Sequence, residues 1–155
     1  MIHQHRTTTG TYIHDRKESI PSKVIKLFLV LSGWKKGIEK DMVRGRIKHQ
    51  PAAIPGSLSG KLSIDTEEFQ GRKVWILRPK QDPSDRTILY FHGGAYIYNI
   101  NRLQWGMIGQ LVKATGATVV VPDYPLAPGA TCKDAFGFCD RVYQKILDEA
   151  SPDKV

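Results

Sequence analysis

The chain has few cysteines: only Cys132 and Cys139 occur among its 155 residues. Two cysteines cannot form a disulfide framework. On the helix predicted around them they lie roughly 10 Å apart along the axis, too far for a disulfide within that helix. We therefore expect both to be small buried hydrophobic residues. Carboxylates and cysteines at metal-ligand spacing are also missing around His3 and His5, so we expect no dedicated metal site and no cofactor.

The chain also lacks a hydrophobic run long enough to cross a membrane. The one candidate, residues 24–31, is far shorter than the roughly 20 apolar residues that span a bilayer. The sequence after it, Ser32-Gly33-Trp34-Lys35, is a poor match to a signal-peptide cleavage site. We therefore expect a cytoplasmic protein without a transmembrane segment.

Acidic residues are scarce in the first third of the chain. Residues 1–50 hold 11 Lys or Arg against 4 Asp or Glu, whereas residues 51–155 hold 12 against 11. A nucleic-acid-binding protein more often carries its basic residues on the folded face that reads the ligand, so we expect no nucleic-acid partner. Two interpretations of the basic segment stay open: a solvated helical face, or weak contact with an anionic surface such as lipid headgroups.

Composition and turn signals divide the chain into three parts. Residues 1–50 form a polar arm and a helical segment over 18–48, with Ser19 or Ser22 as its cap and Gly33 and Gly37 as breaks. Residues 51–60 are a linker rich in Pro, Gly and Ser. Its Gly56–Gly60 stretch has Leu at the middle position, where a nucleophile elbow needs Ser, so we reject it as a nucleophile.

Residues 61–155 alternate between strand and helix patterns, which favours an α/β fold. Two parallel buried strands, 87–91 and 117–121, should be joined by a helix over about 102–115. The remaining predicted elements are a hairpin from 61–65 and 73–78 with its turn near Gly71, and a helix that follows a capping box at 131–134.

The stretch Phe91-His92-Gly93-Gly94-Ala95-Tyr96 directly follows the first buried strand. Adjacent glycines leave consecutive backbone N–H groups open toward one small anion, which is how an oxyanion hole for acyl transfer is built. A glycine turn with a histidine satisfied by local hydrogen bonds would explain the same residues without any catalytic role.

A second motif follows the next strand. Asp123-Tyr124-Pro125-Leu126-Ala127-Pro128, together with the His-Gly-Gly turn, resembles the hormone-sensitive-lipase-like branch of the α/β-hydrolase esterases. That family carries His-Gly-Gly-Gly (the HGGG motif) after one strand and Asp-Tyr-Arg-Leu-Ala-Pro-Glu after the next. The resemblance covers about residues 61–149 and implies a partial α/β-hydrolase fold, the first strands of the sheet with flanking helices. The helices of the basic N-terminal segment look like the family's cap region.

The resemblance also assigns roles. Gly93, Gly94 and Ala95 would donate N–H groups to the oxyanion, His92 would brace the loop without being the triad base, and Tyr96 would line the pocket mouth or be a plain buried aromatic. Asp123 and Tyr124 would support the loop from behind. The chain departs from the family pattern in having Ala95 for the third glycine, Pro125 for arginine and Gly129 for glutamate, which puts any family salt bridge at the second motif in doubt.

The family's mechanism needs Gly-x-Ser-x-Gly, then Asp or Glu, then His, and this ordered set is absent after Asp123, where neither Gly-x-Ser-x-Gly nor any His occurs. We therefore expect the N-terminal half of a serine carboxylesterase or lipase of small esters, cut before the nucleophile strand, inactive alone and completed by a C-terminal half. The resemblance leaves homo-oligomerisation open. The alternatives are a non-catalytic ligand-binding protein on the same scaffold and an inactive truncated product.

Overall fold

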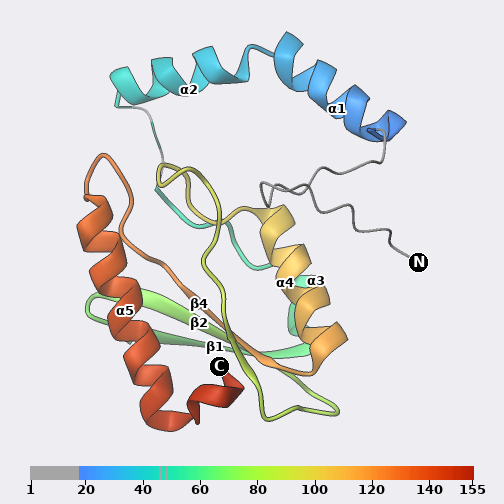
Figure 1. The fold of residues 1–155 in the computed structure, drawn as a ribbon, viewed down its shortest axis with the longest axis vertical. Coiled ribbons are helices and arrows are strands. Elements are labelled where there is room, and N and C mark those ends of the chain that lie inside the picture. Colours follow the sequence, from blue (N-terminus) through green and yellow to red (C-terminus); the bar gives the residue numbers. More distant parts are fainter. Residues whose placement is uncertain (1–17, 46, 48) are drawn as a thin grey trace, which may run out of the picture. The chain divides into compact units, whose positions relative to one another are not determined.

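The computed structural model describes residues 18–45, 47 and 49–155 (Figure 1). The predicted polar arm with His3, His5 and His14 lies outside the described residues, as do Arg46 and Lys48. The chain divides into two compact units, Met1–Gly45 and Arg46–Val155. Among the described helices, none is long and apolar enough to cross a membrane.

The first unit contains two helices, α1 (Ile20–Leu31) and α2 (Trp34–Val43). Ser19 caps α1 by accepting a hydrogen bond from the backbone N–H of Ser22 at 3.3 Å, as predicted. Gly33 adopts a left-handed conformation with φ of 61° and separates the helices. The predicted second break at Gly37 is wrong, because this glycine lies inside α2.

The second unit is built on a four-stranded sheet with the order β1-β2-β4-β3. The predicted hairpin is confirmed: β1 (Leu62–Phe69) and β2 (Arg72–Pro79) are antiparallel. Both turn residues between them, Gln70 and Gly71, have positive φ, as a tight two-residue hairpin turn requires. β3 (Thr87–Leu89) pairs with β4 (Thr118–Pro122) in parallel, as predicted, and β4 pairs with β2 in antiparallel.

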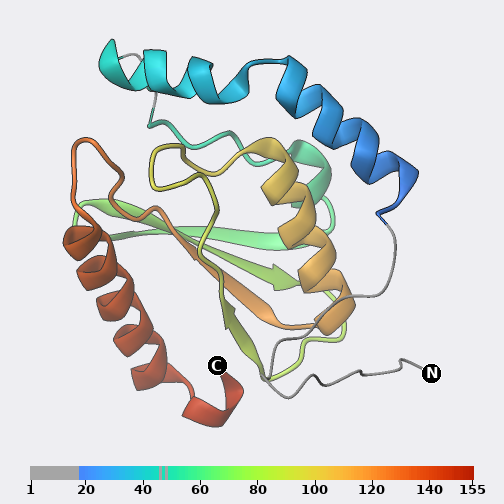
Figure 2. The same ribbon diagram turned by 45° about the horizontal axis from the view of Figure 1, so that its top comes forward.

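Successive residues of the strands alternate between two hydrophobic cores, one on each face of the sheet. Leu77 and Val119 pack on one face against Trp105 of α4 (Arg102–Thr115). Ile76 and Val120 pack on the other face against α5 (Cys132–Glu149). Figure 2 shows the sheet between these two helices. The α/β class expected from the sequence is thus confirmed, because helices cover both faces of a sheet that contains a parallel pair.

The segment at 51–60, expected as a linker, packs on the α4 side of the sheet. Ala52 accepts a hydrogen bond from the indole Nε1 of Trp105 at 2.8 Å, and its N–H donates to the carbonyl of Ile100 at 2.9 Å. A short helix, α3 (Gly56–Ser59), brings Leu58 against the same hydrophobic core. These bonds make the segment part of the second unit.

Two burial predictions are wrong. β3 spans only 87–89 and is half-buried, with Phe91 beyond it 49% exposed, because β3 has one neighbouring strand, β4, in the described sheet. Cys132 is exposed because it is the first residue of α5 and faces away from the core. Cys139 is half-buried and packs against the core beneath α5, and burial raises the pKa of its thiol to about 11.

Candidate functional site

The His-Gly-Gly turn follows β3 as a tight loop. Gly94 has φ of 146°, and its carbonyl accepts hydrogen bonds from the N–H groups of Ile97 at 3.0 Å and Tyr98 at 2.9 Å. A Cβ atom at Gly94 would lie 2.1 Å from the carbonyl oxygen of Tyr98, so only glycine fits. Ala95 and Tyr96 continue the loop in the left-handed region, with φ of 54° and 59°. The backbone therefore follows a path that most residues disfavour.

Three consecutive N–H groups of this loop are available to a ligand. Those of Gly93, Gly94 and Ala95 donate no hydrogen bond to any residue that the structure describes. The carbonyl of Gly93, in contrast, accepts from the side-chain Nε2 of Gln104 at 3.1 Å and from Nδ1 of His92 at 3.2 Å. The carbonyls of Gly93 and Gly94 thus accept hydrogen bonds while the three N–H groups stay free, which is the arrangement that suits an anion.

His92 lies beneath the loop rather than at its surface. Its side chain is 2% exposed, and its ring stacks on that of Tyr124 with centroids 4.4 Å apart and planes 16° apart. Burial lowers the pKa of His92, and this outweighs the opposing effects of the Gly93 carbonyl and the Asp123 carboxylate. His92 is therefore a neutral, packed ring whose Nδ1–H braces the backbone that follows it.

Tyr124 connects the two loops that follow β3 and β4. Its hydroxyl donates to the carbonyl oxygen of His92. Burial raises the pKa of Tyr124 to about 12, so the phenol keeps its proton and stays a donor. Tyr96 packs edge-on against the same ring at 5.9 Å, and its carbonyl accepts from the N–H of Ala127 at 2.8 Å. The second motif thus holds the first at both ends.

Asp123 is held by two side chains from elsewhere in the chain. Arg72, at the start of β2, donates to the backbone carbonyls of Asp123 and Tyr124, the latter at 3.3 Å, and its Nη2 lies 3.5 Å from the Asp123 carboxylate. Asn99 donates through Nδ2 to the same carboxylate at 2.7 Å and to the carbonyl of His49 at 2.9 Å. Arg72 thus places a guanidinium beside the motif in which Pro125 stands for the family's arginine.

An apolar groove of about 590 Å³ lies beside the open edge of β3. Its walls come from β3, from the residues after it and from α5, and Tyr96 and Tyr124 reach it from the two loops. Its exposed aromatic residues are Phe91, Tyr96, Phe136 and Tyr143. The groove therefore presents an apolar surface next to the loop of free N–H groups.

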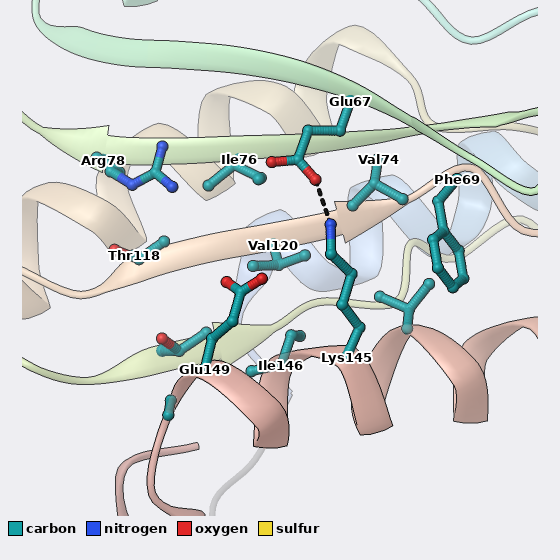
Figure 3. Close-up of a pocket in the computed structure, with 13 residues that line it drawn as sticks. Glu67, Phe69, Val74, Ile76, Arg78, Thr118, Val120, Lys145, Ile146 and Glu149 are labelled. Carbon is teal, nitrogen blue, oxygen red and sulfur yellow. Dashed lines mark hydrogen bonds and ion pairs between the residues drawn. The ribbon is translucent and has the colours of Figure 1, made fainter.

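A smaller cavity of about 180 Å³ lies between α5 and the sheet (Figure 3). Apolar side chains such as Val74, Ile76 and Val120 form its floor, and an ion pair between Glu67 and Lys145 crosses it. The hydrogen bond that Lys145 donates to the Glu67 carboxylate raises the pKa of Lys145. This lysine is therefore a charged partner of Glu67 and not a free base. No residue of the loop at 92–96 lines the cavity.

The second half of the chain matches a known family. Residues 88–155, which contain β3, both motifs and α5, match a family described as the alpha/beta hydrolase fold. These residues therefore have part of the α/β-hydrolase fold. Nothing in the described residues gathers three or more His, Cys, Asp or Glu side chains that could hold a metal ion.

Several proteins resemble this chain. It is 37% identical over 79 residues to the Mycobacterium tuberculosis protein named "Putative acetyl-hydrolase LipR", a stretch that covers 51% of this chain and 26% of that protein. A structure described as a "putative esterase" from Staphylococcus aureus aligns with a TM-score of 0.64 at 23% identity, over 74% of this chain and 39% of that one. An esterase of the bacterial hormone-sensitive lipase family aligns with a TM-score of 0.50 at 21% identity, over 59% and 33%. The chain thus spans between a quarter and two fifths of these proteins.

The hydrolase loop depends on residues that the sequence did not single out. Arg72 and Asn99 lie 51 and 24 positions before Asp123, and Gln104 lies 11 positions after Gly93. Asn101 and Gln104 form a capping box at the start of α4. The second role of Gln104, holding the Gly93 carbonyl, follows only from where α4 begins relative to the loop.

Proposed function

We propose that this chain supplies the oxyanion-hole half of a serine carboxylic-ester hydrolase that acts on small esters. The observation that carries the proposal is the row of three free N–H groups at Gly93, Gly94 and Ala95, in a loop where the carbonyls of Gly93 and Gly94 accept hydrogen bonds. Such a row fits the negatively charged oxygen of a tetrahedral intermediate better than it fits the neutral carbonyl of the ester.

In the proposed reaction a base takes the proton of a serine hydroxyl as its oxygen adds to the ester carbonyl, and the carbonyl oxygen becomes the oxyanion. The base later returns that proton to the leaving alcohol. The N–H groups of the loop donate to the oxyanion, and each donor contributes about 3 kcal/mol to stabilising the transition state. Collapse of the intermediate expels the alcohol and leaves an acyl-enzyme, which water then hydrolyses. Tyr96, on the groove wall beside the loop, would contact the acyl or alcohol group.

The two titratable residues of the motifs do not fit the roles of base and orienting acid. His92 is buried beneath the loop, with Nδ1 on the Gly93 carbonyl. The carboxylate of Asp123 is bonded by Asn99 and faces Arg72. We therefore assign His92, Asp123 and Tyr124 to holding the loop in place, and we assign the catalytic triad to residues outside this sequence, which contains no Gly-x-Ser-x-Gly.

The unpaired edge of β3 is where we place the strand that carries the nucleophile. β3 pairs on one side with β4, and its other side faces the apolar groove in the described structure. An unpaired strand edge beside apolar side chains is suited to accept another strand. We propose that a segment bearing the nucleophile adds its strand along β3 and fills part of the groove.

The test is to express the chain alone and together with a segment of an α/β-hydrolase esterase that begins after the matched region and carries Gly-x-Ser-x-Gly. We expect hydrolysis of p-nitrophenyl acetate by the pair, labelling of the added serine by a fluorophosphonate, and no hydrolysis by either piece alone. Turnover by the isolated chain would contradict the assignment of roles. A stable complex that binds the ester without turnover would favour the non-catalytic binding protein.

A further inference from the structure

The helix α1 exposes nearly all of its large apolar side chains. None of its residues is buried, and these side chains are between 47% and 79% exposed. They are Ile20, Val24, Ile25, Leu27, Phe28, Leu29, Val30 and Leu31. α2 therefore leaves this apolar surface uncovered. Soluble proteins rarely present a contiguous apolar surface of this kind unless something binds to it.

The polar residues of α1 lie together on the opposite side of the helix. At about 100° per residue, the apolar side chains except Val30 fall on an arc of roughly 200°. Ser22, Lys23 and Lys26 occupy the remaining arc, with Val30 between the two lysines. The helix is thus amphipathic, with a wide apolar face and a narrow basic one.

The charges around α1 are mainly positive. Residues 18–45 hold Lys23, Lys26, Lys35, Lys36, Lys40 and Arg44 against Glu18, Glu39 and Asp41. Glu18 pairs with Lys26 at 3.4 Å on the exposed surface. The net positive charge that remains would attract an anionic surface and would repel a basic one.

We propose that α1 binds the surface of an anionic lipid membrane, with its apolar arc among the acyl chains and its lysines at the headgroups. A helix of 12 residues is about 18 Å long, so it can lie in the interface but cannot cross the roughly 30 Å hydrocarbon core. The wide apolar arc and the flanking lysines match the pattern of interfacial helices. This surface lies in the first unit, so the proposal does not depend on the esterase function.

The choice of a lipid surface over a protein groove rests on shape and charge. A protein groove usually accepts a narrow stripe of anchor residues at i, i+3, i+4 and i+7, whereas α1 spreads its apolar residues over more than half of its circumference. Lys23 and Lys26 flank that face on the polar arc, where they can reach lipid phosphates while their aliphatic stems stay in contact with apolar groups.

The test is co-sedimentation of the full chain with vesicles of pure phosphatidylcholine and with vesicles that also contain phosphatidylglycerol. We expect binding to the second kind only, weakened several-fold by 0.5 M salt. Phe28→Asp should abolish it, and Lys23→Glu should weaken it several-fold. Leu103→Asp is the matched control, because Leu103 is an 85% exposed apolar residue at the start of α4. It should bind like the original chain.

Three results would overturn the proposal. The first is no binding to anionic vesicles by a chain with the expected helical circular dichroism. The second is equal binding by the Phe28→Asp and Leu103→Asp variants. The third is a dimer in analytical ultracentrifugation that Phe28→Asp dissociates while no vesicle binding is seen, which would assign the apolar face of α1 to a second copy of the chain.

Discussion

The hydroxyl of Tyr124 donates a hydrogen bond to the backbone carbonyl of His92, and the rings of the two residues stack with centroids 4.4 Å apart. This pair connects the loop after β3 to the loop after β4, across 32 positions of sequence. Since β3 and β4 are parallel neighbours, both loops leave the sheet at the same edge. The pair therefore fixes the start of the row of free N–H groups to the body of the sheet.

Tyr124→Phe should destabilise the fold by about 2 kcal/mol, because it keeps the stacked ring but leaves the carbonyl of His92 without its donor. The measurement is the urea dependence of unfolding, followed by circular dichroism. Tyr143→Phe removes a hydroxyl from a tyrosine on the exposed side of α5 and should change stability by no more than about 0.5 kcal/mol. Equal effects of the two substitutions would contradict the role of the Tyr124 hydroxyl.

Arg72→Met should destabilise the fold by about 1–2 kcal/mol, because Arg72 donates to the Asp123 and Tyr124 carbonyls in a partly buried setting. Arg78→Met is the matched control on the same strand. Arg78 pairs with Asp65, with the two side chains 45% and 56% exposed, and such exposed pairs contribute about 0–1 kcal/mol. The same urea titration compares them. A smaller loss for Arg72→Met than for Arg78→Met would show that the second motif does not depend on Arg72.

Substitutions at Gly94 and Ala95 should have opposite effects. Gly94→Ala places a methyl group against the Tyr98 carbonyl and should cost about 3 kcal/mol. Ala95→Gly removes a left-handed alanine, which costs roughly 1–2 kcal/mol, but gives the unfolded chain more freedom, which offsets about 0.4–1 kcal/mol. A net gain of up to about 1 kcal/mol is expected. Thermal unfolding of the two variants checks both signs, and a destabilised Ala95→Gly variant would contradict the strained loop.

His92 should titrate below the pKa of about 6.5 that an unfolded histidine shows, because burial lowers its pKa in the folded state. Between the two pKa values the unfolded chain binds a proton that folded His92 does not. Its contribution to the free energy of unfolding is therefore complete above pH 7 and decreases as the pH falls through 6.5. An NMR titration of the imidazole C–H protons, assigned with His92→Asn, gives the midpoint directly. A midpoint at or above 6.5 would contradict a buried neutral ring.

Local sequence patterns predicted the helices, strands and turns well. They could not predict the contacts between segments that are distant in the sequence. The Thr131 and Asp134 capping box and the hairpin turn at Gly71 depend on residues within a few positions of one another. The bonds of Arg72 to Asp123 depend instead on the register between β2 and β4, in which Val74 lies opposite Pro122. That register is a property of the folded sheet, and no spacing in the sequence encodes it.

The burial of β3 shows the same limit. Its apolar residues indicate a strand with neighbours on both sides, yet the described sheet gives it one. The apolar residues of a strand indicate that it can pack against apolar neighbours. They do not indicate whether the described residues include those neighbours. The groove beside Phe91 and Tyr96 lies along the edge of β3 that has no neighbouring strand in the described sheet.

The most direct test of the account is the rate of p-nitrophenyl acetate hydrolysis by the completed hydrolase when one N–H of the loop is removed. Replacing Gly94 by glycolic acid turns its amide into an ester and deletes the N–H without adding atoms that could clash. We expect kcat to fall by about 10²–10³-fold with KM nearly unchanged. The same replacement at Gly56, which is exposed at the start of α3, should leave kcat unaltered. A Gly94 variant with the kcat of the Gly56 variant would contradict the assignment of this loop as an oxyanion hole.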